Sequence, residues 1–212
     1  MKDGRRLAIA IAVAALLWFY MFSPWTRGLT NFWITMSCAA LTLTGLALAF
    51  RQKERIEVEK PLLQIAGGIA IAFALWGIFW IGDKVSAWLF DFARPGVDSI
   101  YSMKSGLPVG AIAALLLLVI GPAEEFFWRG YVQRTFSRLF KGRKYPADLA
   151  FLSTVLIYAL VHIWSLNFML IMAALVAGAV WGFIYRLCPK ALPALIISHA
   201  LWDALVFVWL PI

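Results

Sequence analysis

The sequence predicts an all-α protein, a polytopic membrane helix bundle of about seven transmembrane helices with a cytoplasmic N-terminus. Composition is the first observation behind this. Of 212 residues, 63% are apolar and only 14% are charged, with a mean hydropathy of +0.84. Soluble domains are about half apolar and a quarter charged, so this chain has too little polar surface to face water. The second observation is that apolar runs long enough to cross a membrane recur along the chain.

Seven of these runs are predicted spans. They are Leu7–Phe22, Phe32–Phe50, Leu62–Ile81, Leu107–Arg134, Leu149–His162, Phe168–Tyr185 and Pro193–Leu210. A more polar segment, residues 82–106, separates the third from the fourth, and within it Val85–Phe92 is predicted as a short interfacial helix. Gly178 and Gly182 form a GxxxG pattern that permits close helix packing, either inside the bundle or between two copies.

Lysine and arginine residues are distributed unequally between the two sides of these spans. Fifteen lie on the side of the N-terminus and four on the other side, or fourteen against four if Arg129 lies within the membrane. Cytoplasmic loops are rich in these residues, so the sequence predicts a multi-pass protein of the inner (cytoplasmic) membrane of a bacterial cell. The net charge of +8 then reflects topology and not nucleic-acid binding. The predicted partners are the lipid bilayer and a membrane-associated substrate, and the oligomeric state stays open.

Ionisable residues at membrane depth cost about 2.5–3.5 kcal/mol each on insertion scales, so each needs a reason. The first group is Gly121-Pro122-Ala123-Glu124-Glu125, followed by Arg129. Glu125 and Arg129, four residues apart, share a helix face and can pair. Glu124 points about 100° away without that partner, and two adjacent buried carboxylates repel. Glu124 is therefore a candidate general base, whereas Glu125–Arg129 alone is equally a structural ion pair. Pro122 is expected to kink the helix.

The second and third groups contain both histidines of the chain. Tyr158 precedes His162 by four residues, and His199 precedes Asp203 by four. A single histidine on an apolar helix is more often structural than catalytic. At about 1.5 Å per residue, however, all three groups reach a similar depth, roughly 14–21 Å from the basic side. We therefore expect one joint site near the middle of the membrane, approached from the inner face.

The order EExxxR (Glu124–Arg129), aromatic-xxx-His (Tyr158–His162) and HxxxD (His199–Asp203) resembles the CPBP family. These are bacterial relatives of the type II CAAX prenyl endopeptidases, also called the Abi family. The resemblance covers about residues 115–205 and divides the chain into 1–106, helices without a recognised motif, and 107–212, the catalytic membrane core. Two positions differ: Tyr158 stands where Phe is usual, and Asp203 where Asn is common.

The resemblance implies an intramembrane endopeptidase acting on a membrane-associated protein or peptide. Glu124 would activate a water with help from His162, His199 and Asp203 would lie on the oxyanion side, and Glu125 and Arg129 would order Glu124. Asp203 donates to an oxyanion only when protonated, so it is also a candidate to orient His199.

Cofactors and competing functions stay open at this stage. A metal-free site is favoured because no HExxH is present, with zinc held by Glu124, His162 and His199 as the alternative. Intramembrane Glu, His and Asp also occur in proton-coupled transporters, although no inverted repeat is evident. A catalytically inactive immunity or scaffold member of the same family is the third possibility.

Overall fold

The computed structural model describes residues 2–51 and 58–212, and within them every regular element is helical. Seven helices are long and apolar enough to cross a membrane, as predicted. Four of them are single, uninterrupted helices: α1 (Lys2–Phe22), α2 (Phe32–Phe50), α3 (Pro61–Leu89) and α9 (Phe168–Leu187). The remaining three spans are assembled from consecutive helical segments.

The longest composite span, residues 109–139, carries the EExxxR sequence. It runs through α5 (Val109–Leu115), the π-helical segment η2 (Leu116–Ile120), α6 (Gly121–Glu125), the π-helical segment η3 (Phe126–Gln133) and α7 (Arg134–Leu139). Next come α8 (Pro146–Val161) and the 3₁₀ turn η4 (His162–Ser165). The last span joins η5 (Pro189–Ala191), α10 (Leu192–Ala204) and the π-helical segment η6 (Leu205–Trp209).

Local sequence explains where several of these helices begin. Asn31 and Asn167 precede α2 and α9, and each side-chain oxygen accepts hydrogen bonds from two backbone N–H groups of the first turn. These contacts satisfy donors that a helix start leaves unpaired. Pro61 and Pro146 occupy the first turn of α3 and α8, where the missing N–H of proline costs nothing.

The prediction of a separate helix at Val85–Phe92 is wrong. Helix α3 continues through Leu89 because nothing in this apolar stretch breaks it, and Phe90 ends it by adopting an extended conformation. The short polar helix is instead α4 (Ala93–Tyr101), followed by the 3₁₀ turn η1 (Ser102–Lys104). An ion pair between Asp83 of α3 and Arg94 fixes α4 to the end of α3.

Pro122 lies where the fourth span changes from π- to α-helix. In the preceding segment the N–H of Gly121 reaches the carbonyl of Leu116, five residues back, so the wider turn accommodates the proline within a continuous helix. Such π-segments occur frequently at functional sites. Gly121 also permits close helix packing, because a Cβ there would lie 2.5 Å from Cα of Ala200 in α10.

The GxxxG pattern of α9 packs inside the bundle. A Cβ on Gly178 would lie 2.8 Å from the Tyr158 ring, and one on Gly182 would lie 3.1 Å from Phe151. Two side chains of η3 use this close approach: Arg129 donates to the Gly178 carbonyl at 3.0 Å and Gln133 to the Gly182 carbonyl at 2.8 Å. Matched four-residue spacings thus lock η3 to α9.

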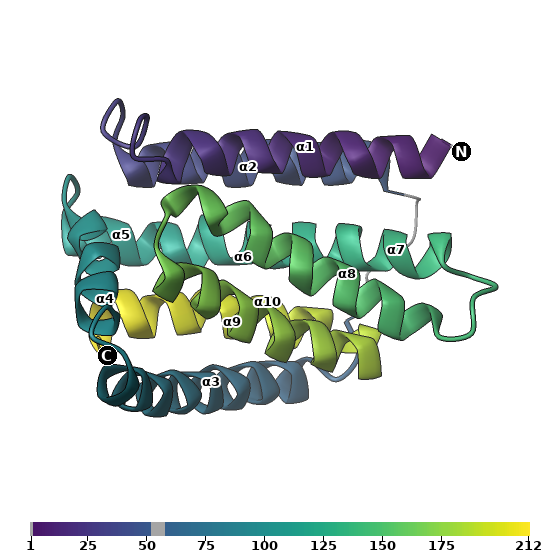
Figure 1. Ribbon diagram of the computed structural model, residues 1–212. Coiled ribbons are helices and arrows are strands. Elements are labelled where there is room, and N and C mark those ends of the chain that lie inside the picture. Colours follow the sequence, from purple (N-terminus) through teal and green to yellow (C-terminus); the bar gives the residue numbers. More distant parts are fainter. Residues whose placement is uncertain (1, 52–57) are drawn as a thin grey trace.

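The two ends of the bundle differ in charge. The N-terminus and the α7–α8 loop lie at one end, and α4 and the C-terminus lie at the other (Figure 1). Most of the described basic residues lie at the first end, while Arg129 is buried within the bundle and Arg27, Lys84, Arg94 and Lys104 lie toward the second. Lys53 and Arg55 lie outside the described residues. We call the first end the basic end and the second the α4 end.

Candidate functional site

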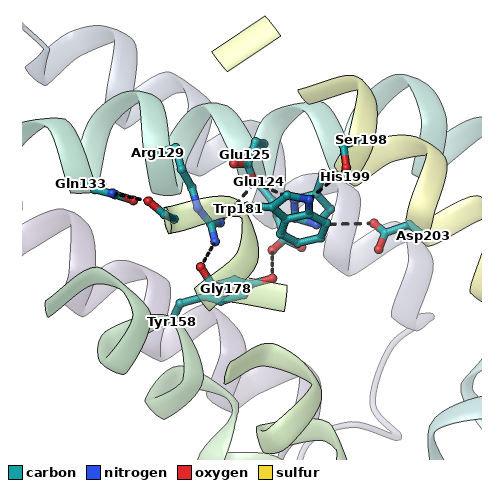
Figure 2. A network of polar contacts seen from close by, with 11 residues as sticks. Glu124, Glu125, Arg129, Gln133, Tyr158, Gly178, Trp181, Ser198, His199 and Asp203 are labelled. Carbon is teal, nitrogen blue, oxygen red and sulfur yellow. Dashed lines mark hydrogen bonds and ion pairs between the residues drawn. The ribbon is translucent and has the colours of Figure 1, made fainter. Parts of the chain in front are cut away.

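Glu125 is the centre of a buried polar network shown in Figure 2. Its carboxylate atom Oε2 accepts hydrogen bonds from Arg129 Nη1 at 3.1 Å and from His199 Nδ1 at 3.0 Å. Glu125 and Arg129 are both completely buried. The predicted pairing along the helix therefore exists, and it extends to α10, which the sequence did not indicate.

Glu124, the neighbouring carboxylate, points elsewhere. Among the described residues it accepts one hydrogen bond, from the Tyr158 hydroxyl to Oε2, at a long distance of 3.3 Å. It is buried in the bundle yet lines a cavity. The two adjacent glutamates thus differ in their surroundings, as their 100° separation on a helix requires. Glu125 is held by two donors, whereas Glu124 faces open space.

His199 is fixed on three sides. Its Nδ1 contacts Glu125, and its Nε2 lies 3.7 Å from Asp203 Oδ2, within ion-pair range but beyond a hydrogen bond. The Trp181 ring of α9 stacks on the imidazole, with centroids 3.9 Å apart and planes inclined by 17°. Trp181 is in turn held by a hydrogen bond from its Nε1 to Ser198 Oγ at 3.1 Å. The orientation of His199 is therefore set by two helices besides its own (Figure 2).

His162 lies on the other side of the cavity, at the C-terminal end of α8. Its Nδ1 is 2.7 Å from the Tyr158 carbonyl, and its Nε2 is 3.0 Å from Trp18 Nε1. A carbonyl only accepts and an indole N–H only donates, so the imidazole is neutral with its proton on Nδ1. Both ring nitrogens are occupied, and no hydrogen bond joins His162 to Glu124 in the described part of the chain.

The donor set does not suit the zinc site raised as an alternative. Zinc needs neutral histidine nitrogens free to coordinate, whereas Trp18 occupies Nε2 of His162 and the carbonyl of Tyr158 accepts from Nδ1. Within residues 2–51 and 58–212, no three His, Cys, Asp or Glu side chains are grouped so that they could hold a metal ion.

A cavity of about 410 Å³ adjoins the network. Its polar lining includes four of the predicted site residues together with Tyr158. They are Glu124, His162, His199 and Asp203. Glu125 and Arg129 lie behind this wall and are not part of the lining. The structure therefore brings all six predicted residues into one region, but divides them into a cavity-facing set and a supporting pair.

Four contributors to this region were missed from the sequence: Trp18, Trp181, Ser198 and Gln133. None of the four has an ionisable side chain, so none stood out among the charged residues at membrane depth. Spacing carried a signal for one of them. Gln133 lies four residues after Arg129, so it extends the helix face of the Glu125–Arg129 pair.

The comparison with protein families agrees with the motif order. Residues 106–205 match the model described as Rce1-like: Type II CAAX prenyl endopeptidase Rce1-like. Residues 106–205 belong to the Rce1-like family. All six predicted site residues and Trp181 fall in this Rce1-like segment, whereas Trp18 does not. A search of curated proteins and a search of solved structures gave no match.

The seven apolar helices describe a multi-pass membrane protein, and its residues 106–205 match the Rce1-like model of type II CAAX prenyl endopeptidases. The N-terminal helices outside the match still contribute to the same core. Trp18 of α1 and Trp33 of α2 pack with Trp128 and Tyr158 of the Rce1-like segment in one apolar cluster. The site is thus completed from outside the matched residues.

Proposed function

We propose that the chain is an intramembrane endopeptidase in which Glu124 activates the water that hydrolyses a peptide bond of a membrane-associated protein or peptide. The observation that carries this proposal is the contrast between the two glutamates. Oε2 of Glu125 accepts from both Arg129 and His199 behind the cavity wall, whereas Glu124 presents a carboxylate to the cavity with one long hydrogen bond. A general base needs an oxygen free to reach water.

The chemical step balances within this site. As the water oxygen bonds to the carbonyl carbon, its proton moves to Glu124 and the carbonyl electron pair moves onto oxygen. Collapse of this tetrahedral intermediate breaks the C–N bond, and the proton held by Glu124 passes to the leaving nitrogen. The products are a carboxylic acid, which then releases its proton to water, and an amine, and no redox partner is required.

His199 is the proposed partner of the oxyanion. Its Nδ1 already donates to Glu125, so Nε2 can donate to the oxyanion only when the ring carries both protons. The carboxylates of Glu125 and Asp203 lie on the two sides of the ring and offset that positive charge. Preorganised donors of this kind contribute strongly to acyl transfer. Asp203 then orients and neutralises His199, which agrees with an aspartate instead of asparagine there.

The proposed mechanism uses no metal, and its test includes that point. The purified protein would be reconstituted with an apolar peptide of about 20 residues that carries a quenched fluorophore pair. We expect Glu124→Gln, which keeps the size and a hydrogen-bond acceptor for Tyr158, to lose cleavage by at least 100-fold while unfolding at an unchanged temperature. The exposed Glu59→Gln is the matched control.

Wild-type cleavage should also persist in a strong chelator. Retained cleavage by Glu124→Gln would overturn the role of Glu124. Loss of wild-type cleavage in the chelator, restored by added zinc, would overturn the metal-free mechanism.

A further inference from the structure

The cavity beside Glu124 extends in one direction only. From the polar wall it passes between apolar side chains of the outer parts of several helices. They include Phe22 of α1, Met36 of α2, Phe79 of α3, Ile100 of α4, Ala173 of α9 and Phe207 of η6. A lining of this kind is typical of sites that hold an apolar ligand with a few placed polar groups.

All of these wall segments lie toward the α4 end of the bundle. Helix α4 covers the cavity there through Val97, Ile100 and Tyr101. It is fixed to α9 by the Asn167 side chain, which donates to the Gly96 carbonyl at 2.8 Å. The α7–α8 loop and the N-terminus are at the opposite end (Figure 1). The approach expected from the sequence, from the basic side, is therefore not where the cavity leads.

The mouth of the cavity opens sideways, toward lipid. Most lining residues are buried or half-buried, but Ile78 of α3, Phe90 after α3 and Phe168 of α9 are 45%, 46% and 55% exposed. These three side chains lie between α3 and the start of α9, and Phe90 and Phe168 stand at the α4 ends of these two spans. We therefore expect an occupant of the cavity to enter from the adjoining leaflet, close to its surface.

The charge distribution assigns this mouth to one leaflet. Among the described residues, twelve lysine and arginine residues lie on the side of the basic end and four on the side of the α4 end, with Arg129 left out as buried. Such an excess marks the cytoplasmic side of a membrane protein. The α4 end, and with it the mouth between α3 and α9, then lies in the non-cytoplasmic leaflet.

We infer that the substrate is an apolar peptide segment anchored in the non-cytoplasmic leaflet, which enters between α3 and α9 and presents its scissile bond from that side. This inference rests on the proposed function and specifies its substrate. A cavity of about 410 Å³ is in the size range of small-molecule pockets. It therefore admits a few side chains of a locally extended segment and not a folded domain. A peptide segment confined to the cytoplasmic leaflet is not expected to reach this cavity.

Access can be measured without catalysis. In a Cys38→Ser/Cys188→Ser background, Ser86→Cys places a thiol on the cavity wall, and Lys141→Cys places one in the α7–α8 loop. A membrane-impermeant maleimide added to intact cells should label Ser86→Cys and not Lys141→Cys. The reverse pattern would overturn the assigned side. An apolar probe peptide added to the Glu124→Gln form should reduce labelling of Ser86→Cys at least fivefold, and unchanged labelling would overturn entry by a peptide.

Cleavage separates this inference from the proposed function. Two quenched 20-residue peptides with a tetralysine tail at one end would be inserted so that the scissile region lies in one leaflet or the other. In proteoliposomes of known orientation, we expect cleavage only of the peptide whose scissile region lies at the α4 side. Cleavage of the opposite peptide alone would overturn the inference and leave the proposed function standing. Cleavage of neither, with labelling still blocked by the peptide, would overturn the proposed function alone.

A variant of the wall provides the matched control. Ala173→Trp fills the cavity between α9 and α4, whereas Ala179→Trp lies on the same helix outside the lining. We expect Ala173→Trp to raise KM for the apolar peptide at least tenfold with a small effect on kcat, and Ala179→Trp to leave both unchanged. Equal KM values for the two variants would overturn the assignment of the cavity as the substrate channel.

Discussion

Glu125 and His199, separated by 74 positions in the chain, are joined by a hydrogen bond of 3.0 Å between Oε2 and Nδ1. The same oxygen also accepts from Arg129. One atom thus connects the span that carries the proposed base to the span that carries the proposed oxyanion partner. This link explains why a pair of glutamates is needed: one holds the two helices in register, and the other is left to face water.

The first prediction concerns this supporting pair. Glu125→Gln leaves the guanidinium of Arg129 buried without its counter-charge, which typically costs about 3–5 kcal/mol. We expect a large fall in the detergent unfolding midpoint for Glu125→Gln and for Arg129→Met. Because the two residues interact directly, the double variant should be less destabilised than the sum of the single variants.

The control for this experiment is an exposed ion pair at the basic end. The Glu59 carboxylate accepts from Lys190 at 2.6 Å, and this contact lowers the pKa of Glu59 below its usual value. Exposed pairs contribute little, so Glu59→Gln should unfold close to the wild-type midpoint. Additive losses in the Glu125/Arg129 cycle would contradict a coupled buried pair.

The second prediction concerns Trp18, whose indole donates to His162 from outside the family match. Trp18→Phe keeps an aromatic ring in the core and removes only the donor to Nε2. A hydrogen bond of this kind contributes about 0.5–1.5 kcal/mol. If it orients His162, kcat should therefore fall about two- to tenfold with KM little changed.

Trp33→Phe is the matched control, because Trp33 is buried in the same apolar cluster as Trp18, while its Nε1 has no hydrogen-bond partner among the described residues. Nitrogen-15 NMR of the two histidines should show a changed Nε2 signal in Trp18→Phe alone. A rate that stays equal to wild type in Trp18→Phe would show that the hydrogen bond has no part in the reaction.

The sequence was sufficient for most features that depend on the position of a residue along one helix. Apolar runs gave the seven spans, and four-residue spacing gave the Glu125–Arg129 pair. The error at Val85–Phe92 arose because charged Asp83 and Lys84 suggested an early end to α3, whereas α4 neutralises Asp83 through Arg94. A charge inside a helix does not end it when a neighbouring helix provides the counter-charge.

What could not be predicted depends on how the helices are rotated against one another. Spacing placed His199 near Asp203, but the hydrogen bond goes to Glu125 on another span. Membrane helices lack the one-sided apolar pattern that fixes rotation in soluble bundles, and small residues at contacts decide it instead. Gly121 against Ala200 and Gly178 against Tyr158 are such contacts, and the sequence does not say which glycine meets which helix.

The third prediction tests that role of glycine. A Cβ on Gly121 would meet backbone atoms of Ala200 at 2.5 and 2.8 Å, and backbone cannot move aside as a flexible side chain can. Gly121→Ala should therefore separate the proposed base from α10, lowering both the unfolding midpoint and cleavage. Gly45→Ala, in α2, meets nothing within 4 Å and should be neutral or slightly stabilising, since alanine favours a helix by about 0.5–1 kcal/mol. Equal midpoints for the two variants would contradict the close packing.

The last prediction concerns Trp181, which stacks on His199 and is held by Ser198. An aromatic face attracts a cationic ring, and a stacked imidazole cannot rotate away from the cavity. Trp181→Leu should therefore lower kcat more than tenfold with a small effect on KM. Trp181→Phe keeps a stacking ring and loses only the N–H, so it should lose about as much activity as Ser198→Ala.

The Trp181→Phe and Ser198→Ala variants form a test of their own. Both remove the same hydrogen bond, so the double variant should be no slower than either single variant. Multiplicative losses would mean that Ser198 and Trp181 act on His199 independently. A Trp181→Leu variant that kept the wild-type kcat would show that the Trp181 ring only fills space in the core. His199 would then hold its orientation through Glu125 without help from α9.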